Sequence, residues 1–183
     1  VFSPWYAWAG RKDPLNHCSV NACIYGPRTN RWAMTERGTA SCHRTQDAFV
    51  IGPSAVEWDG QSLRIQIQET STPWAQSIKG EIRVWPEQLF NFSEGIDHQG
   101  KHRWGPLAPS SRVEVNLQSP QLKWSGQAYL DSNEGDEPIS EGFHTWDWSR
   151  AKMRDNSTLV FYDMQWPGHE DKLLSLRFEP NGA

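Results

Sequence analysis

The stretch Leu63-Arg-Ile-Gln-Ile-Gln68 decides the fold, because apolar and polar side chains alternate along it without interruption. Successive side chains of an extended strand point to opposite faces, so this alternation predicts a β-strand with one buried face. Residues 81–85 and 112–117 repeat the same period. The turn signals Asp59-Gly60 and Ser119-Pro120 lie beside these runs, which is typical of strands joined by short connections.

The rest of the chain also favours strands over helices. Further runs rich in apolar, β-branched and aromatic residues are residues 16–25, 31–37, 56–58, 126–131, 158–165 and 172–179. Helical periodicity is scarce, and only residues 148–153 predict a turn of helix. Many short strands at near-regular spacing predict an all-β fold, an antiparallel barrel or sandwich rather than a βαβ fold.

Composition narrows the class of protein. The 183 residues fit one domain, or one domain and part of another, and a start at Val1-Phe-Ser-Pro4 indicates a piece of a longer protein. The 11 Trp residues suit the walls of a cleft for sugars, lipids or other flat ligands, although a Trp-rich β core would explain them equally well. A net charge of -4 without a basic run argues against a nucleic-acid partner. No apolar run approaches the roughly 20 residues that span a bilayer.

The three cysteines, Cys18, Cys23 and Cys42, form no CxxC pair. If Cys18 and Cys23 share a strand, their odd separation points them to opposite faces, which argues against a mutual disulfide. We interpret all three as small buried hydrophobic residues in a reducing compartment.

Two patterns imitate metal sites without meeting their requirements. The acidic loop that begins at Asp131 has Gly135 and Asp136 in the wrong order for an EF-hand, and Gly142 stands where that loop needs Glu. The spacing His98-Gln-Gly-Lys-His102 imitates a zinc-binding helix, but its glycine disfavours a helix and Gln replaces the required Glu. We therefore expect no metal. A Gly-x-Ser-x-Gly elbow and a glycine-rich phosphate loop are also missing, which argues against a serine hydrolase and a nucleotide site.

Two pairs of polar and aromatic residues stand two positions apart, which places each pair on one face of a strand. They are Tyr129 with Asp131 and, if residues 101–104 are extended, His102 with Trp104. A face with carboxyl, phenol, imidazole and indole groups is unusual for a core and suits the wall of an active site. The alternative is that Tyr129 and His102 hold loops in place while Asp131 caps a turn. Spacing alone leaves both interpretations open.

Six runs resemble the bacterial carotenoid 1,2-hydratases, also called hydroxyneurosporene synthases, in order and spacing over nearly the whole chain. They are Val1-Phe-Ser-Pro-Trp-Tyr-Ala-Trp-Ala9, Asn16-His-Cys18, Arg31-Trp-Ala-Met-Thr-Glu-Arg-Gly38, His102-Arg-Trp104, Tyr129-Leu-Asp-Ser-Asn-Glu-Gly-Asp-Glu-Pro138 and Trp146-Asp-Trp-Ser-Arg150. The resemblance implies a lipocalin-like, two-part β architecture of which residues 1–183 are a fragment. We place a subdivision of the chain near residues 105–111.

The resemblance also implies an activity, the cofactor-free addition of water to the terminal 1,2 double bond of an acyclic carotenoid such as lycopene or neurosporene. It assigns acid/base and binding roles to His102, Trp104, Tyr129 and Asp131. Our hypothesis is that Asp131, kept protonated in an apolar pocket, protonates carbon 2 and leaves a cation at carbon 1. The ring faces of Trp104 and Tyr129, with Trp146 or Trp148 as further candidates, would stabilise the cation, while His102 orients water or accepts its proton. Alternatively, Tyr129 hydrogen-bonds Asp131 and orients its proton.

The remaining expectations concern the substrate and its surroundings. The aromatic residues expected to contact the substrate are Trp5, Tyr6, Trp8, Trp146 and Trp148. Because carotenoids dissolve in bilayers, we expect peripheral contact with the cytoplasmic face of a bacterial photosynthetic membrane. The oligomeric state is left open. The rival hypotheses are a lipocalin-like carrier of lipids or polyenes, a related terpenoid or polyketide cyclase and, more distantly, a sugar-binding or glycan-cleaving sandwich.

Overall fold

The computed structural model describes residues 4–27, 29–142 and 144–182, apart from the side chains of residues 139 and 140. The chain forms two compact units. Unit 1 comprises Val1–Trp85 and Val113–Gly126, and unit 2 comprises Pro86–Arg112 and Gln127–Ala183. The predicted subdivision near residues 105–111 and the fragment character of the chain stay predictions.

The predicted all-β class is confirmed, because antiparallel sheets dominate the chain. The sheets do not close on themselves among the described residues. The first seven strands are β1 (Cys18–Ile24), β2 (Arg31–Arg37), β3 (Cys42–Arg44), β4 (Ala48–Ile51), β5 (Ser54–Trp58), β6 (Leu63–Thr70) and β7 (Ser77–Pro86). The short helices are α1 (Pro4–Trp8), η1 (Pro14–His17), η2 (Thr39–Ser41) and α2 (Ile139–Gly142).

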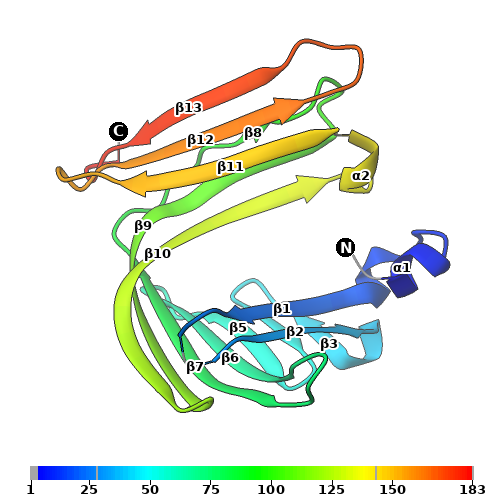
Figure 1. Cartoon of the computed structure of the whole chain (residues 1–183), viewed down its shortest axis with the longest axis vertical. Coiled ribbons are helices and arrows are strands. Elements are labelled where there is room, and N and C mark those ends of the chain that lie inside the picture. The colour runs from blue at the N-terminus through cyan, green and yellow to red at the C-terminus, as the bar shows by residue number, and fades with distance from the viewer. Residues whose placement is uncertain (1–3, 28, 143, 183) are drawn as a thin grey trace. The chain divides into compact units, whose positions relative to one another are not determined.

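Two long strands, β9 (His102–Ser119) and β10 (Leu122–Gly135), each contribute residues to both units. The largest sheet has the order β10-β9-β7-β6-β5-β4-β3, and β8 (Glu94–Gly95) pairs with β9 (Figure 1). The alternation predicted for residues 112–117 is confirmed, because Val113, Val115 and Leu117 are buried while the residues between them are exposed. β9 therefore has one face in the core over this stretch.

The core of unit 1 lies between the β1–β2 hairpin and the strands β6 and β7. Ala22 and Ala33, which are opposite each other in the β1–β2 register, pack with Ile67 and Ile78. Two opposed alanines present little side-chain bulk, so this face of the hairpin can approach the isoleucines closely. The other face of the hairpin therefore points away from this core.

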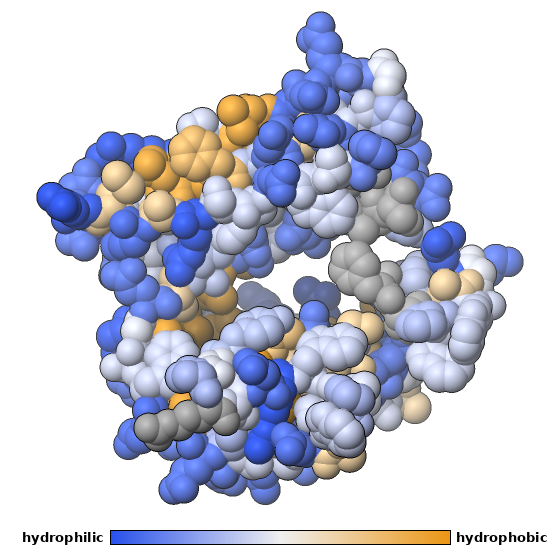
Figure 2. Space-filling model, in the orientation of Figure 1, coloured by the Kyte–Doolittle hydropathy of each residue, from blue (hydrophilic) through white to orange (hydrophobic). Residues whose placement is uncertain are grey.

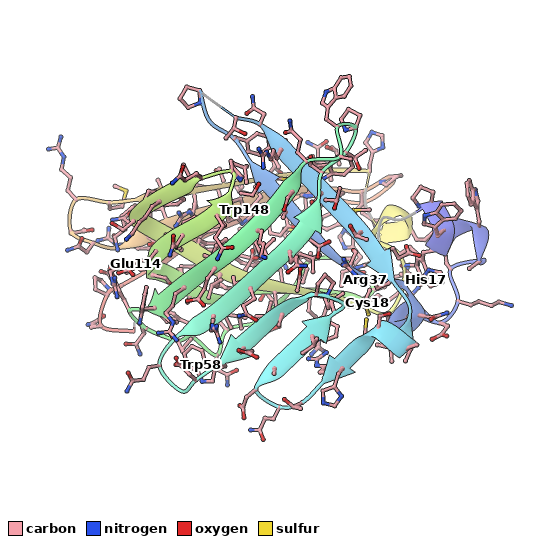
Figure 3. All side chains as sticks on the ribbon, turned by 90° about the horizontal axis from the view of Figure 1, so that it is seen from below. His17, Cys18, Arg37, Trp58, Glu114 and Trp148 are labelled. Atoms are coloured by element: carbon pink, nitrogen blue, oxygen red, sulfur yellow. The ribbon has the colours of Figure 1, made fainter. Side chains whose placement is uncertain are left out.

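A buried ion pair also stabilises unit 1. Arg37 contacts Glu69 with two parallel hydrogen bonds, of 3.0 Å to Oε1 and 2.8 Å to Oε2. The hydroxyl of Ser54 donates a third hydrogen bond to Glu69. The Glu69 side chain is 0% exposed, so its charge is compensated entirely by these neighbours. Figure 3 shows Arg37 beside Cys18, its partner in the β1–β2 register.

Unit 2 contains a sheet of three strands, β11 (Thr145–Lys152), β12 (Thr158–Gln165) and β13 (Lys172–Phe178), which lie side by side in that order (Figure 1). One face of β12 carries Val160, Tyr162 and Met164, all buried. These side chains pack with Trp104 of β9 and Phe178 of β13 in one hydrophobic cluster. The cluster holds Trp104 in place and so positions the site described below.

The helical turn predicted for residues 148–153 is wrong. β11 continues through Lys152 and pairs with β12 over its whole length, from Thr145 opposite Gln165 to Lys152 opposite Thr158. The tertiary partner decides the conformation here, because a short segment with mixed periodicity gains a full ladder of hydrogen bonds by joining the sheet. The extended conformation expected at residues 101–104 is confirmed from His102 onward.

The cysteine predictions are confirmed in part. Cys18 and Cys23 share β1 at an odd separation, and all three cysteines are free thiols. The prediction that all three are buried is wrong, because Cys23 is exposed and Cys18 and Cys42 are partly buried. Burial, followed by the neighbouring Cys42, raises the pKa of the Cys18 thiol. The reducing compartment stays a prediction.

No helix among the described residues is long and apolar enough to cross a membrane.

Candidate active site

The centre of the candidate site is a hydrogen bond between Trp104 of β9 and Asp131 of β10. The indole Nε1–H of Trp104 donates to Asp131 Oδ2 at 2.8 Å. Trp104 is 1% exposed, and edge-to-face contacts with Tyr162 and Phe92 enclose its ring. The donor is therefore fixed by the core, and it meets the carboxylate with its N–H rather than with its ring face.

Tyr129 lies on the same face of β10 as Asp131, as its position two residues earlier predicts. Its hydroxyl is buried and has no hydrogen-bond partner among the described residues. Burial, followed by the nearby Asp131 carboxylate, raises the pKa of Tyr129, so the phenol stays protonated. Trp148 packs against the Tyr129 ring at 5.1 Å between centroids, and the Arg150 guanidinium lies 5.3 Å from that ring.

Tyr162 of β12 belongs to the same group, and sequence reasoning missed it. It is 4% exposed, and its pKa is raised by burial and then by the charge of Asp131. Tyr162 is opposite Trp148 in the β11–β12 register, so both side chains project from one face of that sheet. The sequence shows Tyr162 as one member of an alternating strand, and no signal separates it from its buried neighbours Val160 and Met164.

Asp131 itself is exposed, which differs from the expected carboxyl enclosed in an apolar pocket. Aromatic residues lie near it, but the described residues do not cover it. Because Oδ2 accepts the indole hydrogen bond, a proton on this carboxyl group would be carried by Oδ1. The Asp131 carboxyl group therefore has a fixed orientation and can be reached from solvent.

His102 lies on β9 with Trp104, and it is packed tightly between two glycines. A Cβ atom on Gly135 would lie 2.7 Å from His102 Nδ1, and one on Gly142 would lie 2.9 Å from Nε2. His102 is 4% exposed, so the imidazole has little room to move. Both glycines follow Asp131 in the chain. The stretch that contains them therefore encloses His102.

Three side chains of this region could hold a metal ion. Single ligand atoms of Asp97, His102 and Glu137 all lie within 4.8 Å of one another. His102 Nε2 is 3.8 Å from Glu137 Oε1, and the Lys101 ammonium contacts Glu137 Oε2 at 2.5 Å. Because Lys101 already compensates one carboxylate, the cluster has less need of a divalent cation than the ligand set alone indicates. A cavity of about 260 Å³ adjoins it, lined in part by Asp97, Glu137 and Trp166.

The five predicted substrate-binding residues fall into two groups. Trp146 and Trp148 of β11 are half-exposed and share a face with the buried side of β12. The other three, Trp5, Tyr6 and Trp8, lie on α1 in unit 1. Trp5 and Trp8 contact each other at 4.8 Å, and Tyr6 packs on His17. Contact of all five with a substrate stays a prediction.

Comparisons with known proteins identify the family of the chain. The family model described as carotenoid hydratase CrtC matches residues 1–183. The chain belongs to the CrtC carotenoid hydratase family. It is 52% identical over 188 residues to the acyclic carotenoid 1,2-hydratase of Rubrivivax gelatinosus, which covers 100% of the chain and 46% of the relative. It is 44% identical to the enzyme of that name from Thiocapsa roseopersicina, covering 100% of the chain and 45% of the relative.

Another relative of that name, from Cereibacter sphaeroides, is 38% identical over 89% of this CrtC-family chain and 58% of its own length. The chain thus spans about half the length of the relatives from Rubrivivax gelatinosus and Thiocapsa roseopersicina. No solved structure matches the chain. The predicted family is therefore confirmed.

Proposed function

We propose that the whole protein adds water across the terminal 1,2 double bond of an acyclic carotenoid, such as lycopene or neurosporene, and yields the 1-hydroxy carotenoid. The observation that carries the proposal is the Asp131 carboxyl group, oriented by the Trp104 N–H and near the phenols of Tyr129 and Tyr162. The names of the relatives support the same reaction. Water supplies every atom added, so the reaction balances without a cofactor.

In the first step, the proton on Asp131 Oδ1 passes to carbon 2 of the terminal alkene. The electron pair of the double bond forms the new C–H bond, and carbon 1 becomes a tertiary cation. The Trp104 N–H then donates to a full carboxylate, and hydrogen bonds to charged acceptors are the stronger kind. The indole therefore stabilises the product of proton transfer more than the starting acid, which lowers the barrier.

The substrate itself would exclude water from Asp131. The carboxyl group is exposed in the described chain, and a polyene laid over it is apolar along its whole length. Removal of water disfavours the charged form of a carboxyl group, so binding of the polyene favours the protonated acid. Protonation of Asp131 is thus coupled to substrate binding, and the free protein does not have to bury the carboxyl group permanently.

The cation at carbon 1 needs an aromatic face, and Trp148 is the best placed ring to supply it. Trp148 is 39% exposed and packs against Tyr129, whereas Trp104 is enclosed in the core. The Tyr129 ring already has the Arg150 guanidinium near it, which reduces its attraction for a second cation. One desolvated cation–π contact is worth about 2 kcal/mol, or about thirtyfold in rate.

In the second step, the oxygen of a water molecule forms the bond to carbon 1, and His102 accepts the proton that this water loses. Asp97 and Glu137 lie beside the imidazole, and their negative charge favours its protonated form. His102 then releases its proton to solvent, and solvent returns one proton to Asp131. Because the substrate dissolves in bilayers, we also place the protein at the cytoplasmic face of a photosynthetic membrane, as a peripheral protein.

The test is turnover of lycopene by the full-length protein and by its Asp131→Asn variant, with product analysis in ¹⁸O-labelled water. The wild-type protein should release a product heavier by one water and carrying the label, whereas Asp131→Asn should lose at least about a hundredfold in rate. Asp147→Asn is the matched control, because Asp147 is exposed and lies on the opposite face of β11 from Trp146 and Trp148. Near-normal turnover by Asp131→Asn would refute the proton-donor role.

Product analysis also separates the rival functions. A carrier would bind lycopene and return it unchanged, and a cyclase would give a product of unchanged mass.

A further inference from the structure

Three turns of unit 1 meet at one end of the β1–β2 hairpin. Arg31, at the start of β2, connects them: its Nη1 donates to Ser77 O and to Ser119 Oγ, the latter at 3.0 Å. Ser119 Oγ also donates to Ser77 O at 3.0 Å, and Thr72 N donates to Trp32 O at 2.8 Å. The turn after β1, the turn after β6 and the turn after β9 are therefore held together as one surface.

The side chains that project from this surface are large and aromatic. Tyr25 is 83% exposed, Trp74 76% and Trp32 45%. Cys23 is opposite Trp32 in the β1–β2 register and is exposed as well. We call these three aromatic residues the aromatic rim. Figure 2 shows ring-bearing side chains of intermediate hydropathy gathered on its visible face over β1 and β2.

The segments that form the aromatic rim lack negatively charged residues. The chain has 22 Asp and Glu residues, yet none occurs in residues 18–35, 70–80 or 115–130, which include the three turns. The charged residues described in these segments are cationic, among them Arg31 and Lys79. The three turns that expose Trp and Tyr thus carry no carboxylate of their own, although the chain as a whole is acidic.

We propose that the aromatic rim is the surface by which this protein docks on a lipid bilayer with anionic headgroups. Trp and Tyr have an apolar ring and a polar N–H or O–H, so they suit the boundary between headgroups and acyl chains. A surface without carboxylates does not repel anionic lipid. The purpose of docking rests on the proposed function, because a carotenoid is delivered from a bilayer, but the docking geometry does not depend on catalysis.

A bilayer fits this surface better than a protein partner. Protein interfaces bury their aromatic residues inside a rim of polar and charged groups, which supply specificity. Here Tyr25 and Trp74 stand outside the strands and Trp32 at the start of β2, and the groups near them include the Ser77 and Ser119 hydroxyls and the Arg31 guanidinium. The competing occupant is the part of the full-length chain beyond the described residues, since the described chain covers 46% of one relative and 45% of another.

The experiment is flotation of the full-length protein with vesicles of phosphatidylcholine alone or mixed with phosphatidylglycerol. The wild type should float with the mixed vesicles and less with phosphatidylcholine alone. The double variant Tyr25→Ser/Trp74→Ser should partition at least about tenfold more weakly, because two exposed rings no longer leave water. Trp124→Ser is the matched control, since Trp124 is also an exposed Trp of unit 1 (46%) and lies outside the rim; its partitioning should be unchanged.

Two further readouts keep the outcome decisive if a variant is unstable. A fluorophore on the exposed Cys23 of the wild type should shift to the blue with vesicles and be quenched by lipid-attached quenchers. Equal flotation of the double variant and the control, or no spectral shift, would overturn the proposal. Slow modification of Cys23 by a water-soluble thiol reagent without vesicles would also overturn it, because the rest of the chain would then cover the surface.

Hydration of detergent-dispersed lycopene by the double variant separates this proposal from the proposed function. We expect normal turnover there, because the rim supplies docking and not chemistry. Lost flotation with normal turnover supports docking, whereas flotation without any hydration by the wild type would refute the proposed function and leave the docking surface intact.

Discussion

Two carboxylates, Glu69 in unit 1 and Asp131 in unit 2, are each held by a nitrogen donor, and the difference between them separates structure from chemistry. Glu69 is fully buried and neutralised by the guanidinium of Arg37. Asp131 is exposed and accepts a hydrogen bond from a neutral indole. A carboxylate paired with a buried cation is committed to a structural role, whereas one held by a neutral donor keeps its orientation and has no compensating charge of its own.

The largest expected effect is on stability, from Glu69→Gln. This change leaves the guanidinium of Arg37, which is 15% exposed, without its counter-charge, and breaking a buried pair costs about 3 kcal/mol. The midpoint of urea unfolding of unit 1 should fall accordingly, while lycopene hydration by the surviving folded protein stays normal. Glu57→Gln is the control, since Glu57 is 42% exposed in its pair with Arg64 and should change stability by less than about 0.5 kcal/mol.

Trp104→Phe tests the other carboxylate. The variant keeps a smaller aromatic ring in the core and removes the donor to Asp131, so kcat should fall about thirtyfold, or about 2 kcal/mol, with little change in KM. A parallel rise in KM would show that Trp104 acts by shaping the substrate site. Trp124→Phe, at an exposed position of unit 1, should leave both constants unchanged.

Gly142→Ala should have a smaller effect, by displacing His102. The new Cβ would lie 2.9 Å from Nε2, so the imidazole or the α2 backbone must shift, and kcat should fall about tenfold. Gly95→Ala is the control, because a Cβ there meets nothing within 4 Å. Equal activities of the two variants would show that the position of His102 does not matter for the rate.

The smallest effect concerns the phenols near Asp131. The pKa of Tyr129 and that of Tyr162 are raised in the folded protein, by burial first and then by Asp131. Above pH about 10 the unfolded chain releases these protons while the folded chain retains them, so the stability of unit 2 should fall as the pH rises. In Tyr129→Phe one of these phenols is missing, so the stability of unit 2 should fall less steeply as the pH rises above about 10. Urea midpoints measured at neutral and alkaline pH would detect the change, and an unchanged slope in the variant would contradict it.

Much of the fold could be predicted from the sequence, because period-two alternation is a local property of a strand. Residues 63–68 and 112–117 became strands; the apolar face of residues 112–117 is buried, whereas in residues 63–68 Ile67 is buried and Leu63 and Ile65 are partly buried. The helical turn at residues 148–153 failed because pairing with β12 outweighs a weak local preference. The burial of Cys23 failed because the β1–β2 hairpin has only one covered face, and the sequence does not show which.

The candidate site divides in the same way. Spacing alone placed Tyr129 with Asp131, and His102 with Trp104, on common strand faces, because side-chain direction repeats every second residue. Only the tertiary structure decided that the Trp104 N–H meets Asp131, that Tyr162 completes the group, and that Asp97 and Glu137 flank His102. These contacts join residues from strands far apart in the sequence, and their distances depend on how the strands pair and pack, which no local pattern encodes.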